Sequence, residues 1–158
     1  MIASLAVLAL FLGTIAYAWK CGAAPERRGA ATLLIVLLLS MVRTQLVGFN
    51  IGGLDWTGLA IDTFAFLIFS RVAIHAWRVW PIWAASLQLL AVFSHAVRVL
   101  EIDMDPLAYG IMRSGPTYFV AITLLIGTMS HRRLMRAGVN RPCWRDWSQP
   151  SHRQMLTR

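Results

Sequence analysis

Four polar side chains fall within long apolar stretches of this sequence: Arg43, Asp62, Gln88 and His95. Asp62 lies seventeen residues before Val79, and His95 lies sixteen residues after it. If two antiparallel helices meet near Val79, both side chains lie about 25 Å from that turn. A carboxylate and an imidazole at one depth can hold a proton between them, and they can also simply neutralise each other.

Arg43 is expected in the same layer, and Gln88 on the same helix face as His95. Arg43 lies fifteen residues beyond Arg28, which places it about 22 Å along an earlier helix. Gln88 and His95 are seven residues apart, so they share one helix face. We therefore expect one polar cluster, in which Asp62 pairs with Arg43 or His95. Its functional interpretation is a proton or ion relay or a ligand site, and the structural alternative is a pin that fixes helix register.

Three histidines suggest cofactor ligation. Ala91 precedes His95 by four residues, and this AxxxH pattern resembles bacterial light-harvesting polypeptides. The resemblance implies that His95 ligates bacteriochlorophyll. His75 and His131 end two other apolar stretches, which is where a pair of haem ligands would lie. The alternative is that the protein binds no cofactor and that each histidine packs within the bundle or lies at the membrane interface.

Motifs that would identify an enzyme are absent from the sequence. HExxH, GxSxG and the phosphate-binding loop do not occur. Cys21 and Cys143 form no CxxC pair, so we predict no metal site. Both fall on the predicted cytoplasmic side, where thiols stay reduced, so we predict no disulfide. The sequence therefore gives no reason to expect an enzyme.

The composition indicates a membrane protein. Of 158 residues, 58% are hydrophobic and 14% are charged, against about 25% charged in a soluble domain. The mean hydropathy is +0.60. The net charge is +8, but the cations flank apolar stretches, which favours anionic lipid headgroups as their partners and not nucleic acid.

Apolar stretches of membrane-spanning length recur along the chain. We predict an all-α, polytopic bundle within residues 1–130, followed by a basic cytoplasmic tail, 131–158. The five expected transmembrane helices cover about 2–19, 30–49, 56–76, 81–100 and 109–130.

The distribution of Lys and Arg predicts the orientation. Alternate connections carry Lys20 with Arg27 and Arg28, then Arg78, then the C-terminal tail. Cytoplasmic loops are enriched in such residues, so the N-terminus is expected outside and the C-terminus inside a bacterial inner membrane.

The tail combines cations with tryptophans, which are common anchors at protein interfaces. We expect it to contact a partner or lipid through Arg132, Arg133, Arg136, Arg141, Trp144, Arg145 and Trp147.

The segment Trp80-Pro81-Ile82-Trp83, with Asp62, Gln88 and His95, resembles uncharacterised small multi-pass proteins of alphaproteobacterial inner membranes. This resemblance implies location and topology only. The expected role is a non-catalytic accessory or assembly subunit of a larger membrane complex, held by its helices and tail. The alternatives are a pigment- or haem-binding subunit, for example of a photosynthetic or respiratory complex, and a small transporter that uses Asp62 and Arg43.

Overall fold

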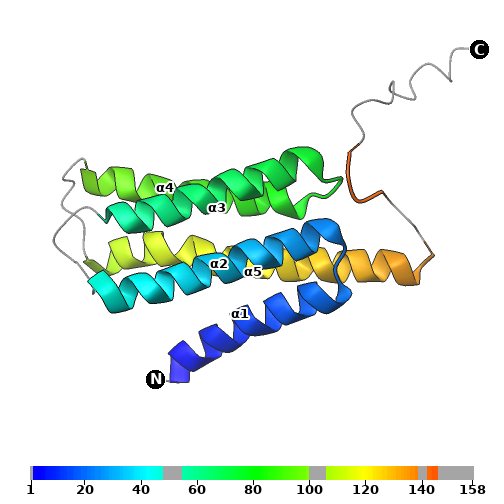
Figure 1. Ribbon diagram of the computed structural model, residues 1–158, viewed down its shortest axis with the longest axis horizontal. Coiled ribbons are helices and arrows are strands. Elements are labelled where there is room, and N and C mark those ends of the chain that lie inside the picture. Colours follow the sequence, from blue (N-terminus) through cyan, green and yellow to red (C-terminus); the bar gives the residue numbers. More distant parts are fainter. Residues whose placement is uncertain (1, 48–54, 100–105, 139–141, 146–158) are drawn as a thin grey trace, which may run out of the picture.

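The protein is an all-α bundle, seen here in a computed structural model that describes residues 2–47, 55–99, 106–138 and 142–145. Five helices occur in these ranges (Figure 1): α1 (Ile2–Cys21), α2 (Ala24–Val47), α3 (Trp56–His75), α4 (Trp80–Val99) and α5 (Pro106–Arg136). The predicted all-helical fold is confirmed. Within the same ranges the only β-type pairing is an isolated bridge between Ala76 and Trp144.

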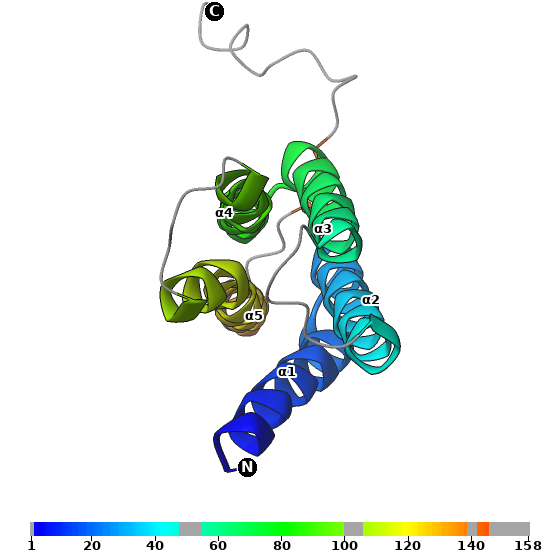
Figure 2. The same ribbon diagram turned by 90° about the vertical axis from the view of Figure 1, so that its left-hand side faces the viewer.

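The helices close into a ring when the bundle is viewed from its end (Figure 2). α4 packs against α3 and α5, α1 packs against α2 and α5, and α2 packs against α3. α2 also contacts α5 across the ring. Successive helices run in opposite directions, so the turns collect at the two ends of the bundle (Figure 1).

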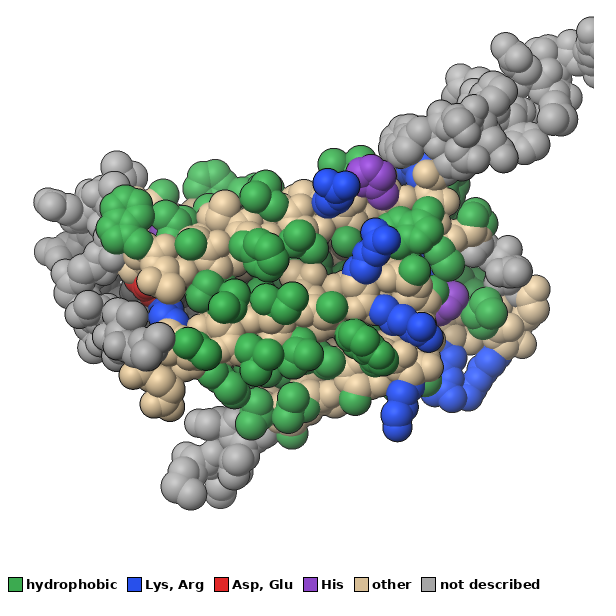
Figure 3. Space-filling view, viewed as in Figure 1, with side chains coloured by type: hydrophobic (Ala, Val, Ile, Leu, Met, Phe, Trp, Pro, Cys, Tyr) green, Lys and Arg blue, Asp and Glu red, His purple; other side chains and the backbone are tan. Residues whose placement is uncertain are grey.

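Three of the helices are long and apolar enough to cross a membrane: Ala24–Gln45, Trp56–His75 and Trp80–Val97. Large apolar side chains cover much of the face of the bundle seen in Figure 3 between its ends. Leu38, Phe93 and Phe119, on three different helices, are 53%, 58% and 57% exposed. Such a surface is unfavourable in water and suits a hydrocarbon environment. Lys and Arg side chains gather mainly at the end where α2 begins and α3 ends, hereafter the basic end (Figure 3).

An apolar layer fills the middle of the bundle. Leu33, Phe69 and Leu124 are 0–1% exposed and belong to one continuous core cluster. Each comes from a different helix, namely α2, α3 and α5.

Trp80 fills the core at the basic end. A Cβ on Gly29 would lie 2.5 Å from its indole ring, and a Cβ on Gly127 would lie 2.4 Å from it. These glycines on α2 and α5 therefore provide the space in which the first side chain of α4 packs.

Two helix boundaries differ from the expected spans. α2 begins at Ala24 and not near residue 30, because Pro25 and Glu26 suit the first turn of a helix. α5 continues to Arg136, so it includes the first residues of the expected tail, and it ends before Gly138, whose φ of 73° is readily adopted by glycine. Pro116 lies inside this helix.

Candidate functional site

The centre of the predicted polar cluster is a buried carboxylate on α3. Asp62 Oδ1 accepts a hydrogen bond from Gln88 Nε2 at 2.9 Å, and Oδ2 lies 3.0 Å from His95 Nε2. Gln88 and His95 are each 1% exposed and lie on α4. The short turn between α3 and α4 brings Asp62 and His95 to one depth, and Gln88, seven residues before His95 on α4, reaches the Asp62 carboxylate from nearer the turn. We call these three residues the Asp62 cluster.

The geometry assigns roles to the two nitrogens of the His95 ring. With an ionised Asp62 carboxylate, which can only accept, His95 Nε2 is the donor of this hydrogen bond. Nδ1 is buried and has no hydrogen-bond partner within the residues that the structure describes. The cluster can therefore hold a proton between His95 and Asp62, while the remaining ring nitrogen points into packed protein.

Arg43 has a different partner from the one anticipated first. Its Nη1 donates to Asp55 Oδ2, on the residue that caps α3. Asp55 Oδ1 accepts from Gly58 N at 2.8 Å, which is a normal N-cap interaction. Of the two partners expected for Asp62, the structure thus pairs it with His95.

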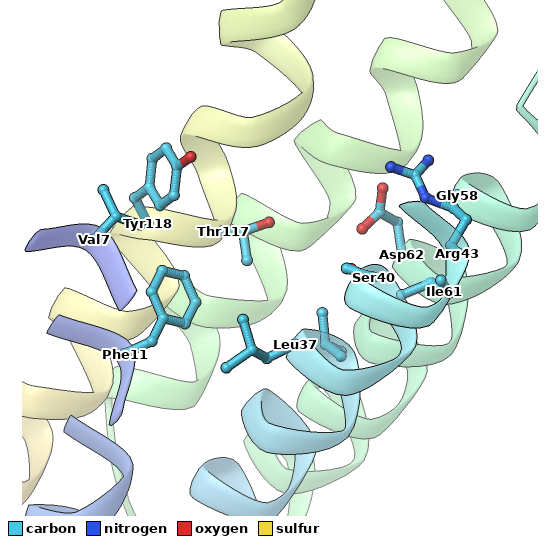
Figure 4. A pocket seen from close by; sticks show the side chains of 11 residues that line it. Val7, Phe11, Leu37, Ser40, Arg43, Gly58, Ile61, Asp62, Thr117 and Tyr118 are labelled. Carbon is cyan, nitrogen blue, oxygen red and sulfur yellow. The ribbon is translucent and has the colours of Figure 1, made fainter. Parts of the chain in front are cut away.

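Arg43 and Asp62 nevertheless line one cavity of about 250 Å³. Their charged groups lie on one side of it, and Phe11 and Tyr118 lie on the other (Figure 4). The two aromatic rings meet edge to face, with centroids 5.9 Å apart. The cavity gives a small polar molecule room beside the Asp62 carboxylate.

A second polar cluster, absent from the predictions, lies at the basic end. The Glu26 side chain is fully buried, at 0% exposure. Its Oε1 accepts hydrogen bonds from Trp80 Nε1 at 3.2 Å and from Arg78 Nε at 3.3 Å. Its Oε2 accepts a hydrogen bond from Ala23 N at 3.0 Å. Arg78 Nη2 also donates to His131 Nδ1 at 2.9 Å. We call Glu26, Arg78, Trp80 and His131 the Glu26 cluster.

A sequence signal for Glu26 does exist. It is the only acid in the first 54 residues, and it directly follows Pro25. Proline and an acid together are typical of a helix start, where the carboxylate accepts a hydrogen bond from the backbone N–H three residues before it. The cations of this segment indicate a connection between spans, whereas Pro25 and Glu26 indicate that a helix already begins there.

The two histidines considered for haem are separated. His75 lines a cavity between α2 and α3, whereas His131 lines one between α4 and α5. His75 Nδ1 is 2.8 Å from Arg71 O, and His131 Nδ1 accepts from Arg78. The described residues contain no group of three or more His, Cys, Asp or Glu that could hold a metal ion.

The described residues of the tail contact the chain's own helices. Trp77 N donates to Cys143 O at 3.2 Å, and Arg145 N donates to His75 O at 2.7 Å. Arg28 stacks over the Trp144 ring, 4.4 Å from its centroid. Residues 142–145 therefore dock on the turn between α3 and α4.

The other predicted contact residues lie around α5. Arg133 and Arg136 are exposed near its end. Arg132 Nη1 donates to Tyr17 Oη at 3.5 Å, and this hydrogen bond raises the pKa of Arg132. Arg141 and Trp147 lie outside the described residues.

Comparison of the chain with protein-family models, with curated proteins and with solved structures gives no match. The two resemblances stated above therefore stay predictions, and the function has to be argued from the geometry.

Proposed function

We propose that this protein is a five-span inner-membrane protein and a non-catalytic accessory or assembly subunit of a larger membrane complex. Its N-terminus lies outside and its C-terminus in the cytoplasm. α1 and α5 add two spans to the three apolar helices. With 20 and 31 residues they reach about 30 Å and about 46 Å, enough for a hydrocarbon core of about 30 Å.

The observation that carries the proposed role is the pairing of acids. The described residues contain three of them, and each faces a base of this same chain: Glu26 faces Arg78, Asp55 faces Arg43, and Asp62 faces His95. Each pair joins two different segments of the fold. Acids that are paired in this way stabilise the packing of the helices, which is a structural role.

The apolar layer supports the same conclusion. Leu33 lies seven residues from Glu26, Phe69 seven from Asp62, and Leu124 seven from His131. Each spacing corresponds to about 10 Å along a helix. Packed apolar side chains thus separate the Asp62 cluster from the Glu26 cluster, which disfavours a continuous route for ions between them.

The test is native electrophoresis of membranes solubilised in a mild detergent, with the chain at its natural level. We expect it to migrate with other chains in a defined stoichiometry. We also expect truncation after Arg145 to weaken that association while leaving the helical content unchanged. Migration as a free monomer would refute the subunit role. A reporter fused at Arg158 that is active only in the periplasm would refute the topology.

Two alternatives have their own supporting observations. The cavity beside Asp62 favours a small transporter, which predicts proton uptake by liposomes carrying the protein and its loss in Asp62→Asn. His95 Nδ1, which has no hydrogen-bond partner among the described residues, favours cofactor ligation. That alternative predicts a Soret or near-infrared absorption band, and a colourless protein purified from the native host would refute it.

A further inference from the structure

A cavity of about 510 Å³ opens between α2 and α3 at the basic end. α2 contributes Arg28 and Ile35 to its lining, α3 contributes Phe64, Ile68 and Arg71, and the segment 142–145 contributes Trp144 and Arg145. The cavity shares no lining residue with the Asp62 cluster or the Glu26 cluster.

The segment 142–145 is held over this cavity by its backbone. The bridge between Ala76 and Trp144, which consists of the hydrogen bonds from Trp77 N and Arg145 N, fixes its course. Trp144 thereby presents its ring to Arg28. The part of the cavity lining that comes from the segment 142–145 is thus held in place by the fold.

The upper part of the cavity is cationic. Arg28, Arg71 and Arg145 line it together with His75, and none of the described residues that line it is an acid. The Arg71 guanidinium makes no ion pair or hydrogen bond with the described residues, and Arg28 contacts only the ring of Trp144 there. Guanidinium groups without a carboxylate partner are well suited to bind a phosphate.

The lower part of the cavity is apolar and opens sideways. Ile35 lies seven residues from Arg28, and Phe64 lies seven residues from Arg71, so each is about 10 Å further into the bundle. Ile35 is 43% exposed and Phe64 is 40% exposed. A groove with cations at its head and apolar walls below matches a molecule with an anionic head and a hydrocarbon chain.

We propose that this cavity is a binding site for one anionic phospholipid of the cytoplasmic leaflet. Arg28 and Arg71 bind the phosphate, His75 and Arg145 flank the headgroup, and one acyl chain lies against Ile35, Phe64 and Ile68. The inference rests on the proposed membrane topology, which places the basic end at the cytoplasmic surface.

The test compares phosphatidylglycerol with phosphatidylcholine on the full-length protein, purified in a non-ionic detergent, by native mass spectrometry and thermal unfolding. We expect phosphatidylglycerol to be retained preferentially and to raise the unfolding temperature. Arg28→Gln and Arg71→Gln should each weaken its binding about fivefold. Arg27→Gln is the matched control: it is the adjacent cation, it is exposed, and it does not line the cavity. The affinity of the Arg27→Gln variant for phosphatidylglycerol should stay within about twofold of wild type.

A second variant tests the groove without changing charge. Ile68→Trp fills the space under the arginines and should reduce lipid retention while the helical content stays the same. Inorganic phosphate, which carries no chain, should not compete at concentrations that match the lipid. Equal retention of the two lipids, equal losses in Arg27→Gln and Arg28→Gln, or full competition by phosphate would each overturn the proposal. A failed lipid test with the predicted topology intact would leave the proposed function standing, because topology is measured separately by the fusion at Arg158.

Discussion

The pair formed by Asp62 and His95 predicts a measurable coupling between α3 and α4. Asp62 accepts two hydrogen bonds, from Gln88 and from His95, and both donors are buried. Asp62→Ala removes both acceptor oxygens and leaves an amide and an imidazole without partners. Each stranded buried donor costs about 1–3 kcal/mol, so we expect the free energy of unfolding to fall by about 2–5 kcal/mol.

A double-mutant cycle separates the pair from the general effect of each substitution. Neutral interhelical hydrogen bonds in membranes average about 0.6 kcal/mol and reach about 1.7 kcal/mol. Breaking a buried charged pair costs about 3–5 kcal/mol. For Asp62→Ala combined with His95→Ala we therefore expect a coupling energy of about 1.5–3 kcal/mol.

The assay is reversible unfolding in mixed detergent micelles, followed by tryptophan fluorescence and circular dichroism. The control cycle replaces His95→Ala with Ser86→Ala, an exposed position on the same helix, for which the coupling should be close to zero. Asp62→Asn keeps one acceptor oxygen and should lose about half as much stability as Asp62→Ala. A coupling below about 0.5 kcal/mol between Asp62 and His95 would show that the pair does not hold α3 to α4.

Three further outcomes are expected. Gly127→Ala should lower the free energy of unfolding by about 1–3 kcal/mol, because the added Cβ meets the ring of Trp80. Gly115→Ala is the control: its Cβ meets nothing within 4 Å, so in the same unfolding assay it should be neutral or stabilising by about 1 kcal/mol. Glu26→Gln should cost about 3 kcal/mol, since it leaves a buried arginine without its carboxylate, and an unchanged unfolding midpoint would contradict the role assigned to the Glu26 cluster. Trp144→Ala should speed hydrogen exchange at the Arg145 amide by releasing the docked segment, and exchange as slow as in wild type would show that the backbone bridge alone holds it.

The position of the Asp62 cluster could be derived from the sequence because a tight turn sets equal depths on two antiparallel helices. Counting from Val79 places Asp62 and His95 at one height, and the spacing of seven brings Gln88 to the face of His95. The same arithmetic did not identify the partner of Arg43. It gives the height of a side chain and not its direction around the helix axis, and Asp55, just before α3, lies within reach of the same guanidinium.

The Glu26 cluster could not be derived in this way, because its members sit where hydropathy changes. Apolar runs locate the middle of a helix well, but a charged first turn can continue the same helix beyond the run. α2 shows this: its first six residues contain Pro25, Glu26, Arg27 and Arg28. The three-way contact of Glu26 with Arg78 and Trp80 also joins residues more than fifty positions apart, and no local pattern signals such a contact.

The distribution of these polar contacts over the helices bears on where a partner would bind. Apolar faces alone do not specify helix pairing in lipid, because hydrocarbon tails are as apolar as the side chains, so polar pairs and small residues determine register. The three acid–base pairs of the described residues involve α2, α3, α4 and the turns before α3 and α4, and none involves α1 or α5. α5 is joined to the turn before α4 by the hydrogen bond from Arg78 to His131. α1 is held by apolar packing, by the ring contact of Phe11 with Tyr118 and by the long hydrogen bond from Arg132 to Tyr17, and the hydroxyl of its buried Thr14 has no hydrogen-bond partner within the described ranges. α1 is therefore the helix whose position a neighbouring subunit can change at the lowest cost in free energy, and crosslinks to such a subunit should concentrate along it.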